Sequence, residues 1–320
     1  MRCVIALVLA ILAAIAIVAR AQSPSYPPPG RMVDIGGRAL HISCTGQGTP
    51  TVVLIAGGGA YSIDWTLVQP TVAQRTRVCA YDRAGLAWSD PGPADETIEQ
   101  TVADLHALLA ASTEPGPYVL VGASIAGLYI RAYQRAFPGD VAALVFTNSS
   151  NRVGINAKGK AGLLWELTEE DIQSAYPLPA SAKGPAPSRE GAPFDRLSPD
   201  LQAVRLWLDV RNWERFTPEA ARPASMLSWR REFIREFDET DGAQPPLGKL
   251  PVVVVSSTGI ASEAERRSRD GAMARLDFLS TNSLHITAEG SGHEIHLFQP
   301  DRVIDGIVKA VTMARPRNSQ

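Results

Sequence analysis

The sequence lacks an excess of either charge and contains little cysteine. Among its 320 residues, 31 lysines and arginines stand against 33 acidic residues, for a net charge of −2, and three residues are cysteine. The absence of a basic excess argues against a nucleic-acid partner, and the absence of an acidic run argues against a solvating tail. Because 45% of the residues are hydrophobic, the composition predicts a globular protein.

Long apolar runs are also absent, except at the N-terminus. There Arg2 precedes an uncharged stretch over residues 3–19, and Ala19-Arg20-Ala21 forms an A-x-A cleavage pattern. The stretch is shorter than the ~20 residues that a membrane-spanning helix prefers. We therefore predict a signal peptide over residues 1–21, an exported protein (periplasmic or secreted) and no stable membrane insertion. An uncleaved membrane anchor is the alternative.

Cleavage before Gln22 leaves two cysteines, Cys44 and Cys79. An even pair of cysteines in an oxidising compartment is a disulfide candidate. Two cysteines do not form a four-ligand zinc site by themselves. The pair therefore predicts a disulfide and not a metal centre.

Strand patterns alternate with helical patterns along most of the chain. After a Pro-rich linker over residues 22–30, strands are expected at 31–34, 38–44, 51–56, 77–81, 118–122, 141–147, 252–257 and 284–288, and helices at 97–111, 125–137 and 302–314. This alternation is typical of a parallel sheet with helices on both faces. Between about residues 148 and 250 no strand pattern is visible, so we expect a helical insertion over the strand ends.

The strongest chemical signal is the segment YVLVGASIAG, residues 118–127. Ser124 lies between a predicted buried strand and a predicted helix, in a turn that requires small neighbours, and Gly122 and Ala126 are small. This is the pattern of a nucleophile elbow, usually written G-x-S-x-G, with alanine here in place of the last glycine. The N-terminus of the helix that follows favours developing negative charge. A serine that merely caps the helix is the other interpretation.

These residues resemble the α/β-hydrolase superfamily, and its capped serine esterase branch in particular, over about residues 31–314. The segments that carry the resemblance are VVLIAGGG (52–59), RVCAYDRAGLAWSDPGP (77–93), YVLVGASIAGLYIRAY (118–133) and GSGHEIHLFQPDRVI (290–304). The resemblance implies an α/β fold with a mostly parallel eight-stranded sheet, helices on both faces, and a helical cap between strands six and seven. We accordingly expect a first core part over residues 31–147, a cap over 148–250 and a second core part over 251–320. The family's strand order also implies that strands two and four lie side by side, which would allow Cys44 and Cys79 to meet.

The resemblance points to His293 as the general base, because the family's chain order is nucleophile, acid and then histidine. His293 follows the last predicted strand, in a loop that contains Gly290 and Gly292. It would take the proton from Ser124 and later donate it to the leaving group. The run His293-Glu294-Ile295-His296 is one residue short of the zinc motif H-E-x-x-H.

An oxyanion hole requires two backbone N–H groups. One is expected at Ile125, directly after the nucleophile. By the family's pattern, the other is expected at Gly58, within the turn Gly57-Gly58-Gly59 after the third strand. A flexible turn without this role is the alternative, whereas a phosphate loop is excluded because G-x-x-x-x-G-K-[ST] is absent.

The acid of the triad has two candidates. In the capped branch an acid often follows strand six, and this chain has Asn148 there, which is able to orient imidazole but brings no charge. The other usual position follows strand seven, where the segment SSTGIASEAE offers Glu263. The flanking residues LVFTNSS match the family better at Asn148, but glutamate at the start of a helix is common for other reasons, and both residues are kept as candidates.

The sequence therefore predicts an exported, carboxylesterase-like serine hydrolase that cleaves a small-molecule carboxylic ester through an acyl-enzyme on Ser124. No metal and no organic cofactor is implied. Hydrolysis of an amide or peptide bond is one alternative. The other is a degenerate, non-catalytic α/β-hydrolase that binds a ligand or a partner. Asn148 favours the degenerate alternative, whereas Ser124, His293 and the glycine turn favour the enzyme.

Overall fold

The computed structural model describes residues 25–93, 97–149, 153–155, 161–163, 168–170, 191–215, 223–240, 242–259 and 274–315. The predicted signal peptide lies outside the described residues. Within the described residues, no helix has the length and the hydropathy that crossing a membrane requires.

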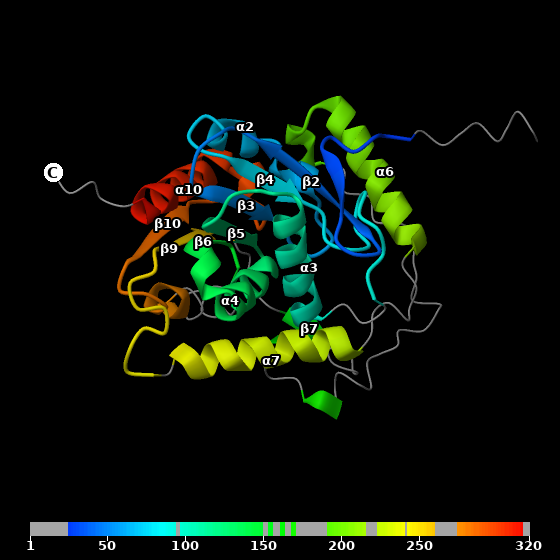
Figure 1. The fold of residues 1–320 in the computed structure, drawn as a ribbon. Helices are drawn as coiled ribbons and strands as arrows, with labels where there is room; N and C mark the ends of the chain where they lie inside the picture. The colour runs from blue at the N-terminus through cyan, green and yellow to red at the C-terminus, as the bar shows by residue number, and fades with distance from the viewer. Residues whose placement is uncertain are drawn as a thin grey trace, which may run out of the picture.

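An eight-stranded sheet forms the centre of the molecule (Figure 1). Its strands are β1 (Arg31–Asp34), β2 (Ala39–Thr45), β3 (Thr51–Ile55), β4 (Val78–Tyr81), β5 (Tyr118–Ala123), β6 (Val141–Thr147), β9 (Val252–Ser257) and β10 (Ser283–Ala288). Their spatial order is β1-β2-β4-β3-β5-β6-β9-β10. The pairs β1·β2 and β2·β4 are antiparallel and all the others are parallel. The predicted mostly parallel eight-stranded sheet is confirmed.

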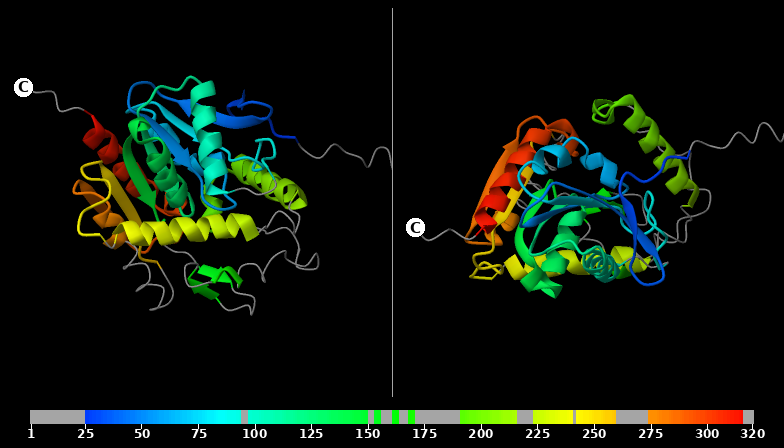
Figure 2. Two further views of the ribbon diagram at one scale, coloured as in Figure 1. Left: turned by 60° about the horizontal axis from the view of Figure 1, so that its bottom comes forward. Right: turned by 45° about the horizontal axis from the view of Figure 1, so that its top comes forward.

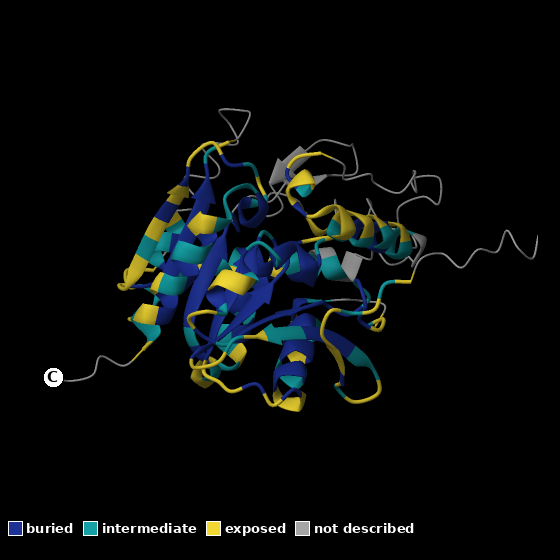
Figure 3. Ribbon diagram, turned by 90° about the horizontal axis from the view of Figure 1, so that it is seen from above, coloured by how far each residue is buried: buried dark blue, intermediate teal, exposed yellow. Residues whose placement is uncertain are grey.

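Two hydrophobic layers cover the two faces of the sheet (Figures 1 and 2). One face is covered by α3 (Ile98–Ala111) and α4 (Ala126–Ala136), and α7 (Pro223–Thr240) packs against these two helices. The other face is covered by α2 (Gln69–Val72) and α10 (Pro300–Ala314). Strands β3, β5 and β9 are buried along their whole length, as uninterrupted apolar runs between two helical layers should be. Figure 3 shows these strands dark blue at the centre of the molecule.

The chain between β6 and β9 contains two long helices, α6 (Pro199–Arg215) and α7. Helix α7 is fastened to α4, because Arg135 on α4 contacts Glu232 at 2.7 Å and Glu239 at 3.0 Å, and the buried Arg131 pairs with Glu239. We propose that residues 148–250 form the insertion, with the core divided into residues 31–147 and 251–320.

The expectation that this insertion contains no strand is wrong. Two short antiparallel strands, β7 (Val153–Ile155) and β8 (Ala161–Leu163), pair with Val153 opposite Leu163. Each has only three residues, and glycine faces glycine at Gly154 and Gly162. Strands this short and this rich in glycine carry almost no β-pattern in the sequence.

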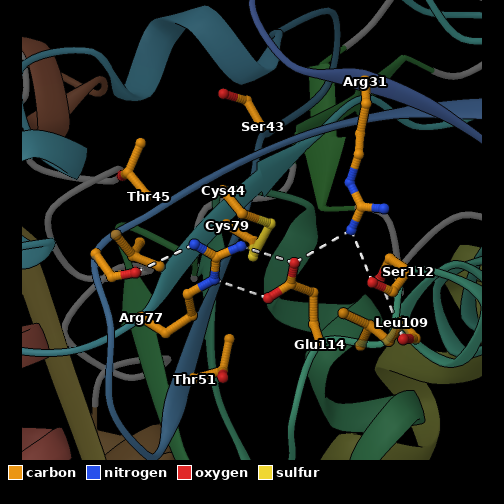
Figure 4. Close-up of a disulfide and its surroundings, with 12 residues drawn as sticks. Arg31, Ser43, Cys44, Thr45, Thr51, Arg77, Cys79, Leu109, Ser112 and Glu114 are labelled. Atoms are coloured by element: carbon orange, nitrogen blue, oxygen red, sulfur yellow. Dashed lines mark hydrogen bonds and ion pairs between the residues drawn. A yellow bond between two sulfur atoms is a disulfide. The ribbon is translucent and has the colours of Figure 1, made fainter.

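Cys44 and Cys79 form a disulfide between β2 and β4, where they stand directly opposite each other. The predicted pairing is therefore present. Beside it, Glu114 accepts hydrogen bonds from Arg77 at 2.8 Å and from Arg31 at 3.3 Å (Figure 4). The hydrogen bond from Arg77 lowers the pKa of the Glu114 carboxyl, and this outweighs the effect of its burial. The disulfide and this ion cluster together tie the antiparallel edge of the sheet to its centre.

The disulfide predicts a stability difference. It links residues 35 positions apart, and closing such a loop in the unfolded chain is worth about 3–4 kcal/mol. Urea unfolding of the Cys44→Ala/Cys79→Ala double variant should show a free energy of unfolding lower by that amount. Reductant should destabilise the wild type and leave the variant unchanged, and a wild type indifferent to reductant would contradict the assignment.

Candidate active site

Ser124 occupies the turn between β5 and α4 in a left-handed backbone conformation, with φ of 53°. A non-glycine residue adopts this conformation at a cost and keeps it only where its surroundings impose it. Here the Ser124 N–H donates to Thr147 O at 3.0 Å, and Gly127 N donates to Ser124 O at 3.1 Å. The turn therefore holds Ser124 at the carboxyl end of a buried strand, with its side chain partly exposed.

Small residues make this turn possible. A Cβ atom on Gly122 would lie 2.6 Å from Ala126 O, and one on Gly127 would lie 2.6 Å from Ser149 Cβ. Ala126 itself is fully buried. The requirement for small neighbours on both sides of Ser124, which the sequence predicted, thus has a steric cause in the close approach of α4 to β5.

Asn148 follows β6, is buried, and also has a positive φ of 49°. Its amide nitrogen lies 3.0 Å from His293 Nδ1 and 3.1 Å from the His293 backbone oxygen. The structure therefore brings this acid candidate against the candidate base. Glu263, the other candidate, lies outside the described residues.

The contact between Asn148 and His293 has a chemical consequence. The backbone oxygen of His293 only accepts, so it fixes the amide with its NH₂ group toward the ring. Because Nδ1 faces a donor, the contact favours the tautomer in which Nδ1 accepts and Nε2 carries the ring proton. A base needs the opposite tautomer, with Nε2 free to receive the serine proton. Asn148 thus orients the ring without preparing it for proton transfer.

The amides of Gly58 and Ile125 are available as oxyanion donors. Neither donates a hydrogen bond to any group in the described ranges, and a Cβ on Gly58 would lie 3.8 Å from Ile125 Cγ2. The turn is held from behind by the buried Arg83, which donates to the oxygens of Ala56 and, at 3.0 Å, Gly57. These contacts hold the backbone of the turn in place at Gly58.

Three of the candidates, Ser124, His293 and Gly58, line one small cavity of about 40 Å³. Its walls are Gly57, Gly58, Ala60, Asp64, Ala123, Ser124, Phe194, Arg205, His293, Glu294 and His296. Sequence reasoning found Gly58, Ser124 and His293. It missed Asp64 and Arg205, which have no local motif and meet only because α6 packs on the core.

His296 is a fully buried wall of this cavity and lies on the ring of Trp65, with centroids 4.7 Å apart. Burial lowers its pKa from 6.5 to about 4, since the charged form is poorly solvated there. The ring is therefore neutral at neutral pH. It serves as packing, in agreement with its place in the short helix α9 (Ile295–Phe298).

With this geometry described, the chain can be compared with known proteins. A family model described as alpha/beta hydrolase family matches residues 52–305, most of the chain. The chain belongs to the alpha/beta hydrolase family. Within this family, the solved structure of an esterase from Thermogutta terrifontis is similar with a TM-score of 0.61 and 20% identity, over 87% of this chain and 95% of that one.

One further solved structure and one curated protein are also similar to this chain. The enol-lactonase from Burkholderia xenovorans LB400 has a TM-score of 0.61 and 19% identity, over 88% of this alpha/beta hydrolase and 100% of that chain. At these identities the likeness shows the fold. The probable transporter efuK from Hormonema carpetanum is 31% identical over 90% of this chain but only 43% of its own length. The chain spans about two fifths or less of the curated relatives it matches.

The packing of the elbow predicts a contrast between two glycines. Gly122→Ala should lower the free energy of unfolding by about 1–3 kcal/mol, because the new methyl group overlaps Ala126 O. Gly58→Ala, whose methyl group meets only ordinary van der Waals contact, is the matched control and should unfold like the wild type. Equal denaturant midpoints for the two variants would contradict the steric account.

The buried His296 predicts a pH dependence of stability. Because its folded pKa of about 4 lies below the unfolded value of 6.5, the unfolded chain binds the proton first as pH falls. The effect of His296 on the free energy of unfolding is therefore absent well above pH 6.5. As the pH falls toward 4, His296 lowers the free energy of unfolding increasingly, by about 3 kcal/mol at pH 4. The test is denaturant unfolding of the wild type and of His296→Phe at neutral pH and at pH 4. Between the two conditions, the free energy of unfolding of His296→Phe should fall by less than that of the wild type, and the difference should equal that amount. Parallel losses in variant and wild type would contradict the assignment.

Proposed function

We propose that the protein is a serine hydrolase that cleaves a carboxylic ester of a small molecule through an acyl-enzyme on Ser124. The observation that carries the proposal is the position of Ser124, held at positive φ in a cavity that His293 and Gly58 also line. A serine presented in this way fits acyl transfer, since it stands next to a histidine and to two backbone amides that donate no hydrogen bond within the described ranges.

The steps follow from this arrangement. The ring of His293 first has to adopt the tautomer with its proton on Nδ1, which the NH₂ group of Asn148 disfavours. Ser124 Oγ then attacks the ester carbonyl while His293 Nε2 accepts its proton, and the carbonyl oxygen gains negative charge between the amides of Gly58 and Ile125. His293 returns the proton to the departing alcohol. Water then attacks the acyl-enzyme by the same route in reverse, which releases the acid and restores Ser124.

Export belongs to the same proposal. It is supported by the signal-peptide pattern over residues 1–21 and by the disulfide between Cys44 and Cys79, which is typical of proteins from oxidising compartments. A periplasmic or secreted esterase meets substrates from outside the cell.

A second candidate is a degenerate hydrolase that binds a ligand without turnover. The observation that favours it is the contact of the Asn148 amide with His293, which favours a ring proton on Nε2 instead of Nδ1. The two candidates differ in whether Ser124 turns over an ester. Amide and peptide substrates are a variant of the first candidate, with the same nucleophile.

The nucleophile assignment predicts loss of activity. Ser124→Ala should reduce kcat on short p-nitrophenyl esters by at least about 10³-fold, because no acyl-enzyme forms. Its unfolding midpoint should stay close to the wild-type value. The control is Ser283→Ala, at an exposed position at the start of β10, which should keep full turnover. Wild-type activity in Ser124→Ala would exclude the elbow, and an inactive wild type would support the degenerate hydrolase.

The contact between Asn148 and His293 predicts a gain of activity. Asn148→Asp should raise kcat by about tenfold or more, because a carboxylate accepts the Nδ1 proton and stabilises the imidazolium. Asn148→Ala should lower kcat, since the ring loses its orienting contact. Steady-state kinetics of both variants and of Glu263→Gln separates the two acid candidates. If Glu263 is the acid, Glu263→Gln loses several orders of magnitude and Asn148→Asp gains nothing.

A further inference from the structure

Arg205 lines the same cavity as Ser124 although it comes from α6, in the insertion at the upper right of Figure 1. Only 2% of its surface is exposed. Its guanidinium lies 4.1 Å from the centroid of the Phe194 ring, another wall of the cavity. A fully buried arginine beside a candidate nucleophile requires an account of what its hydrogen-bond donors bind.

Three of the five N–H groups of Arg205 have acceptors. Nε and Nη2 donate to Asp64 at 2.8 and 3.2 Å, and Nη1 donates to Asp209 at 2.7 Å. A guanidinium carries two N–H groups on each terminal nitrogen. One N–H on Nη1 and one on Nη2 therefore have no acceptor among the residues that the structure describes.

The charge of this cluster restricts the ligand. Asp64 and Asp209 are both buried and both pair with Arg205, so two carboxylates face one guanidinium. Tyr61 donates to Asp209 at 2.8 Å, which stabilises the carboxylate form. The positive charge of Arg205 is thus already paired, and a further anion would enter the buried cavity without a counter-charge from Arg205. A neutral oxygen accepts from Arg205 without this cost.

We infer that Arg205 determines specificity for esters whose short acyl group carries a neutral oxygen acceptor, such as an alkoxyacetate. The inference rests on the proposed ester hydrolysis at Ser124. The cavity is small, about 40 Å³, which favours a short acyl group. An alkyl chain of the same size would leave two buried donors of Arg205 unbound, and sites built to donate a hydrogen bond discriminate strongly against ligands that lack the acceptor.

The test uses three methyl esters of similar size, with acid release followed at constant pH. Methyl methoxyacetate and methyl butanoate differ by one oxygen in place of one CH₂ group, and monomethyl malonate adds a negative charge. For the two neutral esters, kcat/KM is divided by the rate constant of hydroxide hydrolysis, which removes their difference in intrinsic reactivity. The wild type should prefer methoxyacetate over butanoate by at least about tenfold, and malonate should not exceed butanoate.

Variants of the cluster separate specificity from stability. Arg205→Lys keeps the charge but has only three donors, which the two carboxylates occupy, so the preference for methoxyacetate should disappear. Asp209→Asn removes one negative charge, and the relative kcat/KM for malonate should rise. Tyr61→Phe removes a hydrogen bond to Asp209 but no donor of Arg205, and it should keep the preference.

Each outcome decides the inference. Equal normalised rates for the two neutral esters in the wild type would overturn it, whatever the stability of the variants. A preference that persists in folded Arg205→Lys, or malonate as the best substrate, would also overturn it. Hydrolysis of butanoate as fast as methoxyacetate, lost in Ser124→Ala, leaves the proposed function intact. If the wild type hydrolyses no ester, both the inference about Arg205 and the proposed ester hydrolysis at Ser124 are wrong.

Discussion

The close approach of α4 to β5 is the constraint on which the site depends. At Gly122 there is no room for even one methyl group against Ala126 O, and the chain reverses within a few residues. This forces Ser124 to positive φ and presents its side chain at the end of a fully buried strand. A strain of this kind costs on the order of 1–3 kcal/mol, which the packing of the two hydrophobic layers offsets.

The parallel strands bring the remaining groups to the same edge. Gly58 follows β3, Asn148 follows β6 and His293 follows β10, and the carboxyl ends of parallel strands lie together. The proposed insertion adds Arg205 of α6 to the site, where it forms an ion pair with Asp64. The core thus supplies the residues that we propose as nucleophile, base and oxyanion donors, while α6 supplies the wall that we propose selects the acyl group.

Local sequence patterns predicted the strands of the central sheet and the elbow, because each depends on neighbouring residues. The cysteine pair followed instead from the strand order that the family resemblance implies. Apolar runs such as 118–122 mark buried strands, and a serine between small residues marks the turn. The pairing of Arg205 with Asp64 was not predictable, because residues 141 positions apart meet only through the docking of a helix. The direction of the Asn148 amide was likewise hidden, since it depends on the backbone oxygen of His293.

The central claim is that Ser124 is an activated nucleophile. The most direct measurement is labelling of the wild-type protein with a fluorophosphonate, followed by mass spectrometry of the labelled peptide. The account predicts one phosphonyl group per chain, attached to Ser124, with Asn148→Asp reacting faster than the wild type. No reaction of the folded protein, or modification of a different serine, would contradict it.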